Sequence, residues 1–333
     1  MTTTWEDARG ILAEREAQYS TLPVKVAEIR IEPGRLCAGD VAIGLGQEGL
    51  ERICQEVKAP FAYLDRLPGD RQADLLQYHL RRGDLQGDKA EFVIRQQELV
   101  GIERRSLHRL SSTDVLDAIA DGGGSSSLLV HRFQFFQNSF QLDLLSEAHD
   151  AEVAAGDIVQ AGLRVTHSFV GEDATSLEAF VLRLVCSNGL IHRECVSRGT
   201  ARTRRLPASR PDAHALQMEQ VRRLTADILR SLRAKLDTLK SLDREPVEFE
   251  HLMRRWLERS RLSTRSLWPL IEAAWRQEGG RSMAYDAMNA LTRVATHAED
   301  LDFRTRRALS SLAGILAFRQ IHFCPRCFSI LNS

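Results

Sequence analysis

The chain has 333 residues, of which 43% are hydrophobic and 27% charged, the usage of an ordinary globular protein with a sizeable core. At this length we expect one large or two modest domains. No stretch approaches 18 consecutive apolar residues, and the first residues lack a basic segment followed by an apolar run, so we expect neither a membrane-spanning helix nor a secretory signal.

Six cysteines are too few for a disulfide framework, and we expect reduced thiols in a cytoplasmic protein. Four of them are expected to be buried as small hydrophobic side chains: Cys37, Cys54, Cys186 and Cys195.

The net charge is zero, with 45 basic and 45 acidic residues, but the two signs are separated along the chain. Residues 1–190 hold 19 Lys/Arg and 29 Asp/Glu, which leaves 26 and 16 for residues 191–333. The two parts therefore carry −10 and +10. Such asymmetry indicates contact with nucleic acid, or docking of one half on the other.

The first 127 residues alternate between helical and strand patterns. A helix is expected to begin after Thr4 as N-cap, and another after Ser111 or Ser112. Strands with a Pro-Gly turn are predicted over residues 22–36, and a hairpin over 91–110. Further helices are expected in segments 46–57 and 69–82. The DGGGSSS segment at 121–127 is predicted to be a flexible loop.

Four strands follow, which are short, rich in β-branched or aromatic residues and separated by turn residues. They are predicted over 127–137, 139–148, 157–171 and 176–190. Consecutive strands of this kind favour an antiparallel meander.

The character changes to helix from about residue 212. Apolar residues recur every three or four positions in one long segment, and this stripe predicts either a core-facing surface or a dimer seam. The stripe consists of Val221, Leu224, Ile228, Leu232, Leu236 and Leu239. Further helices are predicted over 247–261, 264–277, 283–298 and 303–319.

These elements predict an α+β fold with a mixed N-terminal segment, a central antiparallel sheet and a C-terminal helical region. We expect an α+β domain over residues 1–205, a helical region over 206–320 and a tail over 321–333 that contains the CPRC sequence.

An arginine-rich segment connects the last strand to the long helix. Its arginines are Arg193, Arg198, Arg202, Arg204, Arg205 and Arg210, and the helix continues with Arg222, Arg223, Arg230, Arg233 and Lys235. Arginine forks bind phosphate through paired hydrogen bonds, so Arg193 to Arg223 form the predicted nucleic-acid-binding set. The same residues also suit a solvated linker, or one that docks on the acidic half.

Aromatic residues Phe133, Phe135 and Phe136 lie in one of the predicted strands. They could stack on bases if they faced outward, but alternating strands more often bury such rings.

The CPRC tail resembles half of a zinc site. Cys324 and Cys327 have the spacing with which two thiolates grip one tetrahedral ion, and His322 is a third candidate ligand. Cys186, Cys195, His297 or a second subunit would have to complete it. Zinc is therefore a cofactor candidate. A redox role for the two cysteines is disfavoured, because no strand–C-x-x-C–helix context surrounds them.

No catalytic motif is found in the sequence: no H-E-x-x-H, no P-loop and no G-x-S-x-G. Cys186 could act as a nucleophile with His167 or His192 on a neighbouring strand. A buried cysteine followed by an Asn188-Gly189 turn explains this segment better, because those two residues readily adopt positive φ.

Three segments resemble the phage/plasmid-like family known as domain of unknown function 932. They are ERICQEVKAPFAYLDRLP, GDIVQAGLRVTHSFVGEDATSLEAFVLRLVCSNGLIHR and AYDAMNALTRVATHAEDLDFRTRRALSSLAGILA. The most specific part is Arg183-Leu184-Val185-Cys186-Ser187-Asn188-Gly189, preceded by His167-Ser168, where the family usually has Asn in the first position. The resemblance implies a mobile-element or antiviral defence locus and no established activity.

We therefore expect a non-enzymatic nucleic-acid-binding protein, a homo-oligomer built through the long helix, with no membrane partner. The alternatives are an assembly subunit of a multi-protein complex from the same locus and a metal-dependent enzyme.

Overall fold

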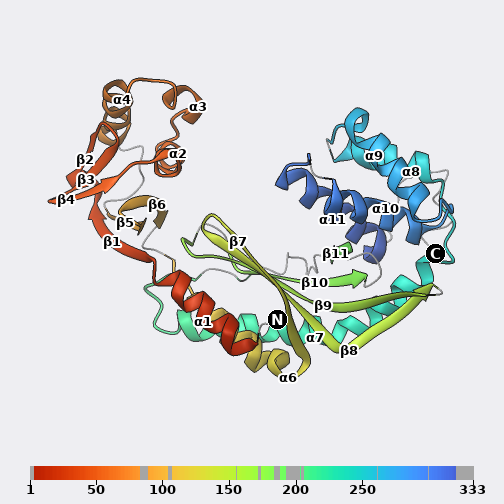
Figure 1. The fold of residues 1–333 in the computed structure, drawn as a ribbon. Helices are drawn as coiled ribbons and strands as arrows, with labels where there is room; N and C mark the ends of the chain where they lie inside the picture. Colours follow the sequence, from red (N-terminus) through yellow and green to blue (C-terminus); the bar gives the residue numbers. More distant parts are fainter. Residues whose placement is uncertain are drawn as a thin grey trace.

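A computed structural model describes residues 4–82, 89–103, 107–154, 156–171, 174–183, 188–192, 203, 206–260, 262–298 and 300–319. The protein has the α+β fold predicted from the sequence, with an N-terminal lobe, a central sheet and a group of C-terminal helices (Figure 1). Within this described part, no helix is long and apolar enough to cross a lipid bilayer.

The N-terminal lobe is a six-stranded mixed sheet with helices packed against it. Its strands are β1 (Tyr19–Lys25), β2 (Ile29–Glu32), β3 (Arg35–Ala38), β4 (Val41–Gly44), β5 (Lys89–Arg95) and β6 (Glu98–Glu103), in the order β1-β5-β6-β4-β3-β2. The short 3₁₀ turn η1 (Val26–Glu28) links β1 to β2, and the helices are α2 (Gln47–Glu56), α3 (Phe61–Leu64) and α4 (Gly69–Arg81). The lobe has its own core, in which Cys54 is fully buried as predicted, and burial raises the pKa of that thiol to about 11. Cys37 is only partly buried.

The central sheet has five strands, each antiparallel to its neighbours. They are β7 (Leu128–Phe136), β8 (Ser139–Ala154), β9 (Asp157–Ser168), β10 (Ser176–Arg183) and β11 (Asn188–His192), in the order β11-β10-β9-β8-β7. The predicted antiparallel meander is confirmed, but the single strand predicted over 176–190 is wrong, because this segment contributes two antiparallel strands, β10 and β11. The predicted turn at Asn188-Gly189 is wrong, because these residues pair in β11 with Arg183 and Leu182.

Helix α7 (Ala213–Leu242) covers one face of this sheet (Figure 1). Its apolar stripe is the one predicted, and five of the six residues are fully buried, Leu224 being partly buried. They pack on the alternate residues of β8 and β9 that point toward the helix, such as Leu144 and Leu163. The apolar stripe of α7 is thus buried against the sheet of the same chain. An oligomer would therefore have to form through a surface other than this stripe.

Two further helices begin at the predicted caps; the second packs on α7, and the first packs on the second and on β7. Thr4 and Ser111 each form a capping box, for α1 (Trp5–Glu16) and α5 (Ser112–Ile119). The predicted loop at 121–127 is wrong: it forms a π-helical turn η2 (Ala120–Gly124) and a short helix α6 (Ser125–Ser127). A Cβ on Gly122 would lie 2.8 Å from the Arg222 carbonyl oxygen, so the glycine permits close packing on α7.

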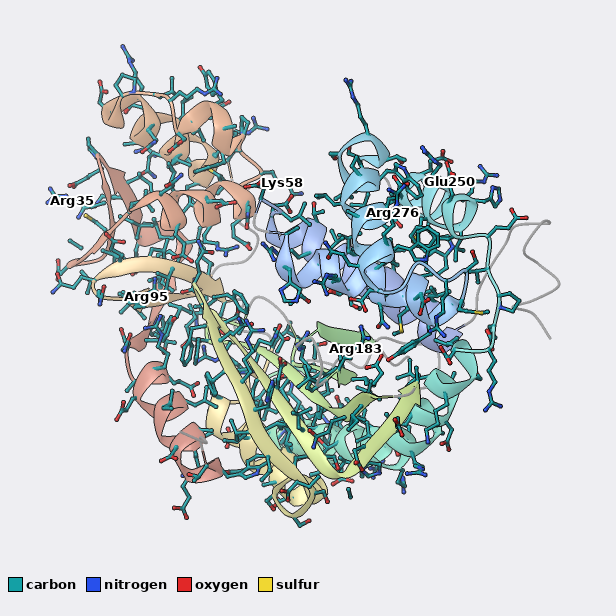
Figure 2. The ribbon with its side chains drawn as sticks, turned by 45° about the vertical axis from the view of Figure 1, so that its right-hand side comes forward. Arg35, Lys58, Arg95, Arg183, Glu250 and Arg276 are labelled. Atoms are coloured by element: carbon teal, nitrogen blue, oxygen red, sulfur yellow. The ribbon has the colours of Figure 1, made fainter. Side chains whose placement is uncertain are left out.

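The C-terminal helices are α8 (Phe249–Arg259), α9 (Thr264–Gln277), α10 (Ala284–His297) and α11 (Phe303–Arg319). Helices α10 and α11 pack against β11, and these helices share one continuous core with α7 and the sheet. Figures 1 and 2 show the N-terminal lobe and the C-terminal helices on the side of the sheet opposite α7.

Candidate nucleic-acid interface

The predicted nucleic-acid-binding arginines divide into those the structure describes and those it does not. Arg193, Arg198, Arg202, Arg204 and Arg205 lie outside the described residues. Arg210, Arg222 and Arg223 are described, and each one pairs with a nearby carboxylate.

These pairs are exposed and mostly local in sequence. Arg210 binds Asp212 through Nε at 2.5 Å, with both side chains about half exposed. Arg222 reaches Asp121 of η2 at 3.2 Å, and Arg223 binds Glu219 one turn earlier at 2.6 Å. The hydrogen bond from Arg223 is the main cause that lowers the pKa of Glu219. Exposed pairs of this kind contribute little to stability, so a competing anion can displace them.

The most exposed arginines of α7 lie on its outer face, away from the sheet. The exposed fractions of the side chains are 75% for Arg223, 77% for Arg230 and 63% for Arg233. Their carboxylate partners are on the same helix, such as Asp227 for Arg230 and Asp237 for Arg233. The three arginines are seven and three residues apart and therefore lie on one side of the helix. The apolar stripe predicts from the sequence that this side faces away from the core.

The described residues next to the arginine-rich segment are attached to the fold. The Thr203 amide donates to the Thr175 carbonyl at 2.9 Å, and Thr203 is buried. The His108 amide donates to the Leu206 carbonyl at 2.7 Å, and Leu107 forms an antiparallel bridge with Pro207.

The face of the central sheet opposite α7 carries a row of buried charges that sequence analysis missed. Asp143, Arg164 and Glu178 lie directly opposite one another on β8, β9 and β10, and all three are buried. Arg164 holds Asp143 through two hydrogen bonds, the one from Nη2 to Oδ2 being 2.6 Å. Its guanidinium also lies 5.2 Å from the ring centre of Phe180. Because strand register is not visible in local sequence, only the pairing of the strands reveals this row.

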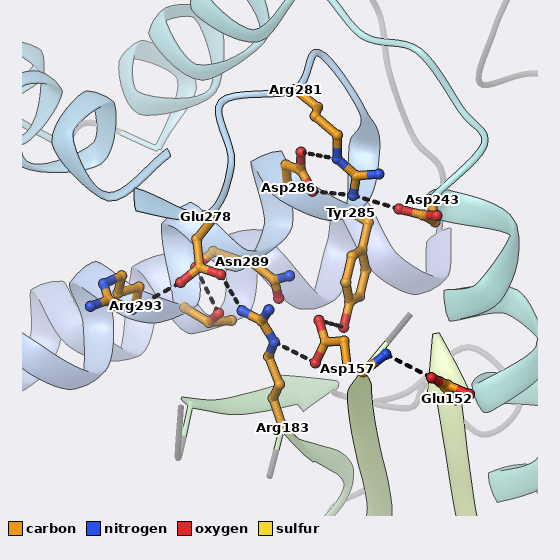
Figure 3. A network of polar contacts seen from close by, with 12 residues as sticks. Glu152, Asp157, Arg183, Asp243, Glu278, Arg281, Tyr285, Asp286, Asn289 and Arg293 are labelled. Carbon is orange, nitrogen blue, oxygen red and sulfur yellow. Dashed lines mark hydrogen bonds and ion pairs between the residues drawn. The ribbon is translucent and has the colours of Figure 1, made fainter. Parts of the chain in front are cut away.

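A second polar network joins the sheet to the C-terminal helices (Figure 3). Arg183, at the end of β10, binds Asp157 of β9 at 2.6 Å and also pairs with Glu278 after α9. The Tyr285 hydroxyl donates to Asp157 at 3.0 Å, and Arg293 binds Glu278 at 3.0 Å. Burial, followed by the charge of Asp157, raises the pKa of Tyr285. The tyrosine therefore stays protonated and serves as a hydrogen-bond donor.

Arg281 extends this junction toward the end of α7. It binds Asp286 at 2.8 Å and Asp243 at 2.6 Å (Figure 3). The hydrogen bonds with Asp286 and then Asp243 raise the pKa of Arg281. These contacts fix the C-terminal helices on the sheet.

The N-terminal lobe is joined to the other end of the strands. Tyr19 of β1 stacks on Phe169 with ring centres 5.2 Å apart, and its hydroxyl contacts Asn138 at 3.3 Å. Arg95 donates to the Gln137 carbonyl at 2.9 Å. Arg95 and Arg183 mark the two junctions in Figure 2.

The aromatic residues considered for base stacking belong to this region. Phe133 stacks on Phe140 with ring centres 5.7 Å apart, and Phe135 stacks on Phe169 at 6.3 Å. Phe133 is packed against the core, while Phe135 is 40% exposed. Their rings are thus engaged in packing within the protein.

The residues considered for zinc or covalent chemistry are mostly outside the described part. This applies to His322, Cys324, Cys327, Cys186 and Cys195. Among the residues that the structure describes, no group of three His, Cys, Asp or Glu side chains is arranged to hold a metal. His167 is buried and its Nδ1 contacts the Thr175 hydroxyl at 2.9 Å, as in a core histidine.

Comparison of the chain with known protein families, with curated proteins and with solved structures finds no match.

Proposed function

We propose that this protein is a non-enzymatic nucleic-acid-binding protein that contacts phosphates through the outer face of α7 and the adjoining arginine-rich segment. The observation that carries the proposal is the set of outward arginines Arg223, Arg230 and Arg233 on one long helix.

The spacing of these arginines suits a regular polyanion. At 1.5 Å per residue, Arg223 and Arg233 are about 15 Å apart along the helix axis. Each DNA strand carries one phosphate about every 3.4 Å along the duplex axis, so the three arginines span roughly four phosphates.

The helix holds the arginines in a fixed line because its other face is buried. Ile228, Leu232 and Leu236 are fully buried against the sheet, which prevents α7 from turning about its axis. A pre-positioned row loses less conformational entropy on binding than arginines on a flexible segment would. Its present partners are exposed carboxylates, which phosphates can replace at low cost.

The resemblance to the phage/plasmid-like family favours a mobile-element or antiviral defence locus as the setting. It supports no reaction, and the proposal includes none. We propose DNA as the polyanion that this surface binds.

The experiment is a binding titration with a labelled DNA duplex of about 20 base pairs at low salt, where phosphate contacts are strongest. Changing Arg223, Arg230 and Arg233 together to Gln is expected to weaken binding at least tenfold. The matched control changes Arg255, Arg265 and Arg276 to Gln. These arginines are exposed on α8 and α9, so the substitutions remove the same amount of charge from a different surface. The proposal fails if the wild-type protein does not bind, or if both variants lose the same affinity.

A further inference from the structure

Two histidines and one carboxylate meet where the chain enters α7. The rings of His108 and His214 are 5.4 Å apart and nearly perpendicular. His214 Nε2 lies 3.3 Å from Asp114 Oδ2, and Asp114 is also the third residue of α5, whose side chain completes the capping box by accepting from the Ser111 amide. The cluster thus includes the first turns of two helices.

The backbone of His108 holds the segment that follows the arginine-rich region. The His108 amide donates to the Leu206 carbonyl at 2.7 Å, while the His108 carbonyl accepts from Gln217 Nε2 of α7 at 3.2 Å. Leu107 and Pro207 pair as an isolated bridge. A disturbance at His108 therefore acts on residues 206–213, to which the arginines preceding residue 206 are covalently joined.

The environment of the His108 ring disfavours its charged form. Its Nε2 is buried and has no hydrogen-bond partner in the described part of the chain. Burial, and then the charge of His214, lower the pKa of His108, while Asp114 acts in the opposite direction.

Two pairs of charged groups lie close to His108 along the described part of the chain. On the incoming segment, Arg210 binds Asp212. On the side of β6, the Arg109 guanidinium lies 3.6 Å from Glu103. Among the described residues, His214 and Asp114 are the charged side chains that act on the His108 ring.

We propose that His108 is a pH-sensitive clamp that holds residues 206–213 at neutral pH and releases them on acidification. A histidine whose pKa is lower in the folded state than its ordinary 6.5 binds more protons when its surroundings open. The stabilisation is present above pH 6.5 and is lost as the pH falls from 6.5 toward the lowered pKa. The effect on nucleic acid rests on the proposed function, whereas the clamp itself does not.

The test is hydrogen exchange of the backbone amides in 107–110 and 206–213, measured by mass spectrometry at pH 5.5 and 7.5 and corrected for intrinsic rates. In the wild type we expect corrected exchange to be several-fold faster at pH 5.5 than at pH 7.5, up to a limit of about tenfold, because pH 5.5 lies one unit below the ordinary pKa of 6.5. His108→Gln should abolish the difference between the two pH values, and His214→Gln should reduce it. His131→Gln, an exposed residue of β7, should leave it unchanged.

Equal corrected exchange at both pH values in the wild type overturns the clamp, and so does a pH difference that persists in His108→Gln. If His108→Gln does not fold, the His214→Gln result decides alone: an undiminished pH difference overturns the clamp. DNA binding measured at the same two pH values separates the two proposals, because absent binding with pH-dependent exchange rejects the proposed function and retains the clamp.

Discussion

The hydroxyl of Tyr285 donates a hydrogen bond of 3.0 Å to Asp157, a residue 128 positions earlier in the chain. Both residues are buried, and Arg183 binds the same carboxylate from β10. The contact joins α10 to the first residue of β9. It places the C-terminal helices on the central sheet and so belongs to the framework that supports α7.

Removing this hydroxyl tests the junction. Tyr285→Phe is expected to lower the free energy of unfolding by about 2 kcal/mol, because a buried carboxylate loses a hydrogen bond. Urea unfolding measures the change. Tyr63→Phe is the control, since Tyr63 is 58% exposed and should stay within about 0.5 kcal/mol of the wild type. Equal stability of the Tyr285→Phe variant and the wild type would show that the hydrogen bond is not made.

The buried pair of Asp143 and Arg164 should depend on both partners. Arg164→Met leaves Asp143 buried without its cation and is expected to cost about 3–5 kcal/mol. Adding Asp143→Leu removes the stranded charge, so the double variant should be more stable than Arg164→Met alone. A double variant whose loss equals the sum of the single losses would mean that the two side chains do not interact.

The centre of the sheet should not tolerate a side chain at Gly162. A Cβ there would lie 2.1 Å from the Leu144 carbonyl oxygen and 2.9 Å from the Phe180 ring. Gly162→Ala is therefore expected to destabilise the protein by about 2 kcal/mol, as overpacking does. Gly10→Ala, with open space on helix α1, should stabilise it by about 0.5–1 kcal/mol. Thermal unfolding compares the two, and a harmless Gly162→Ala would contradict the strand register.

Local patterns were sufficient for most elements of the fold. The stripe from Val221 to Leu239 predicts the long helix, because the helical period of 3.6 residues places apolar residues every three or four positions. Thr4 and Ser111 likewise predict the starts of two helices, since all the residues of a capping box lie within four positions of the sequence. The loop predicted around the glycines at 122 and 124 is wrong. These glycines allow the backbone to pack closely on α7 and on the preceding turn of helix.

The candidate site was only partly predictable. The arginines of α7 are visible in the sequence, and their outward direction follows from the buried stripe. The row of Asp143, Arg164 and Glu178 depends on strand register, and the Tyr285–Asp157 contact joins distant segments. Neither leaves a signal in a local window of sequence.

The salt dependence of DNA binding is the most direct test of the central claim. The logarithm of the association constant should fall linearly with the logarithm of salt concentration, by about 0.9 for each phosphate neutralised. Replacing Arg223, Arg230 and Arg233 with Gln should therefore reduce the magnitude of the slope by about 2.7. An unchanged slope in this variant would show that the outer face of α7 does not contact phosphate and would contradict the account.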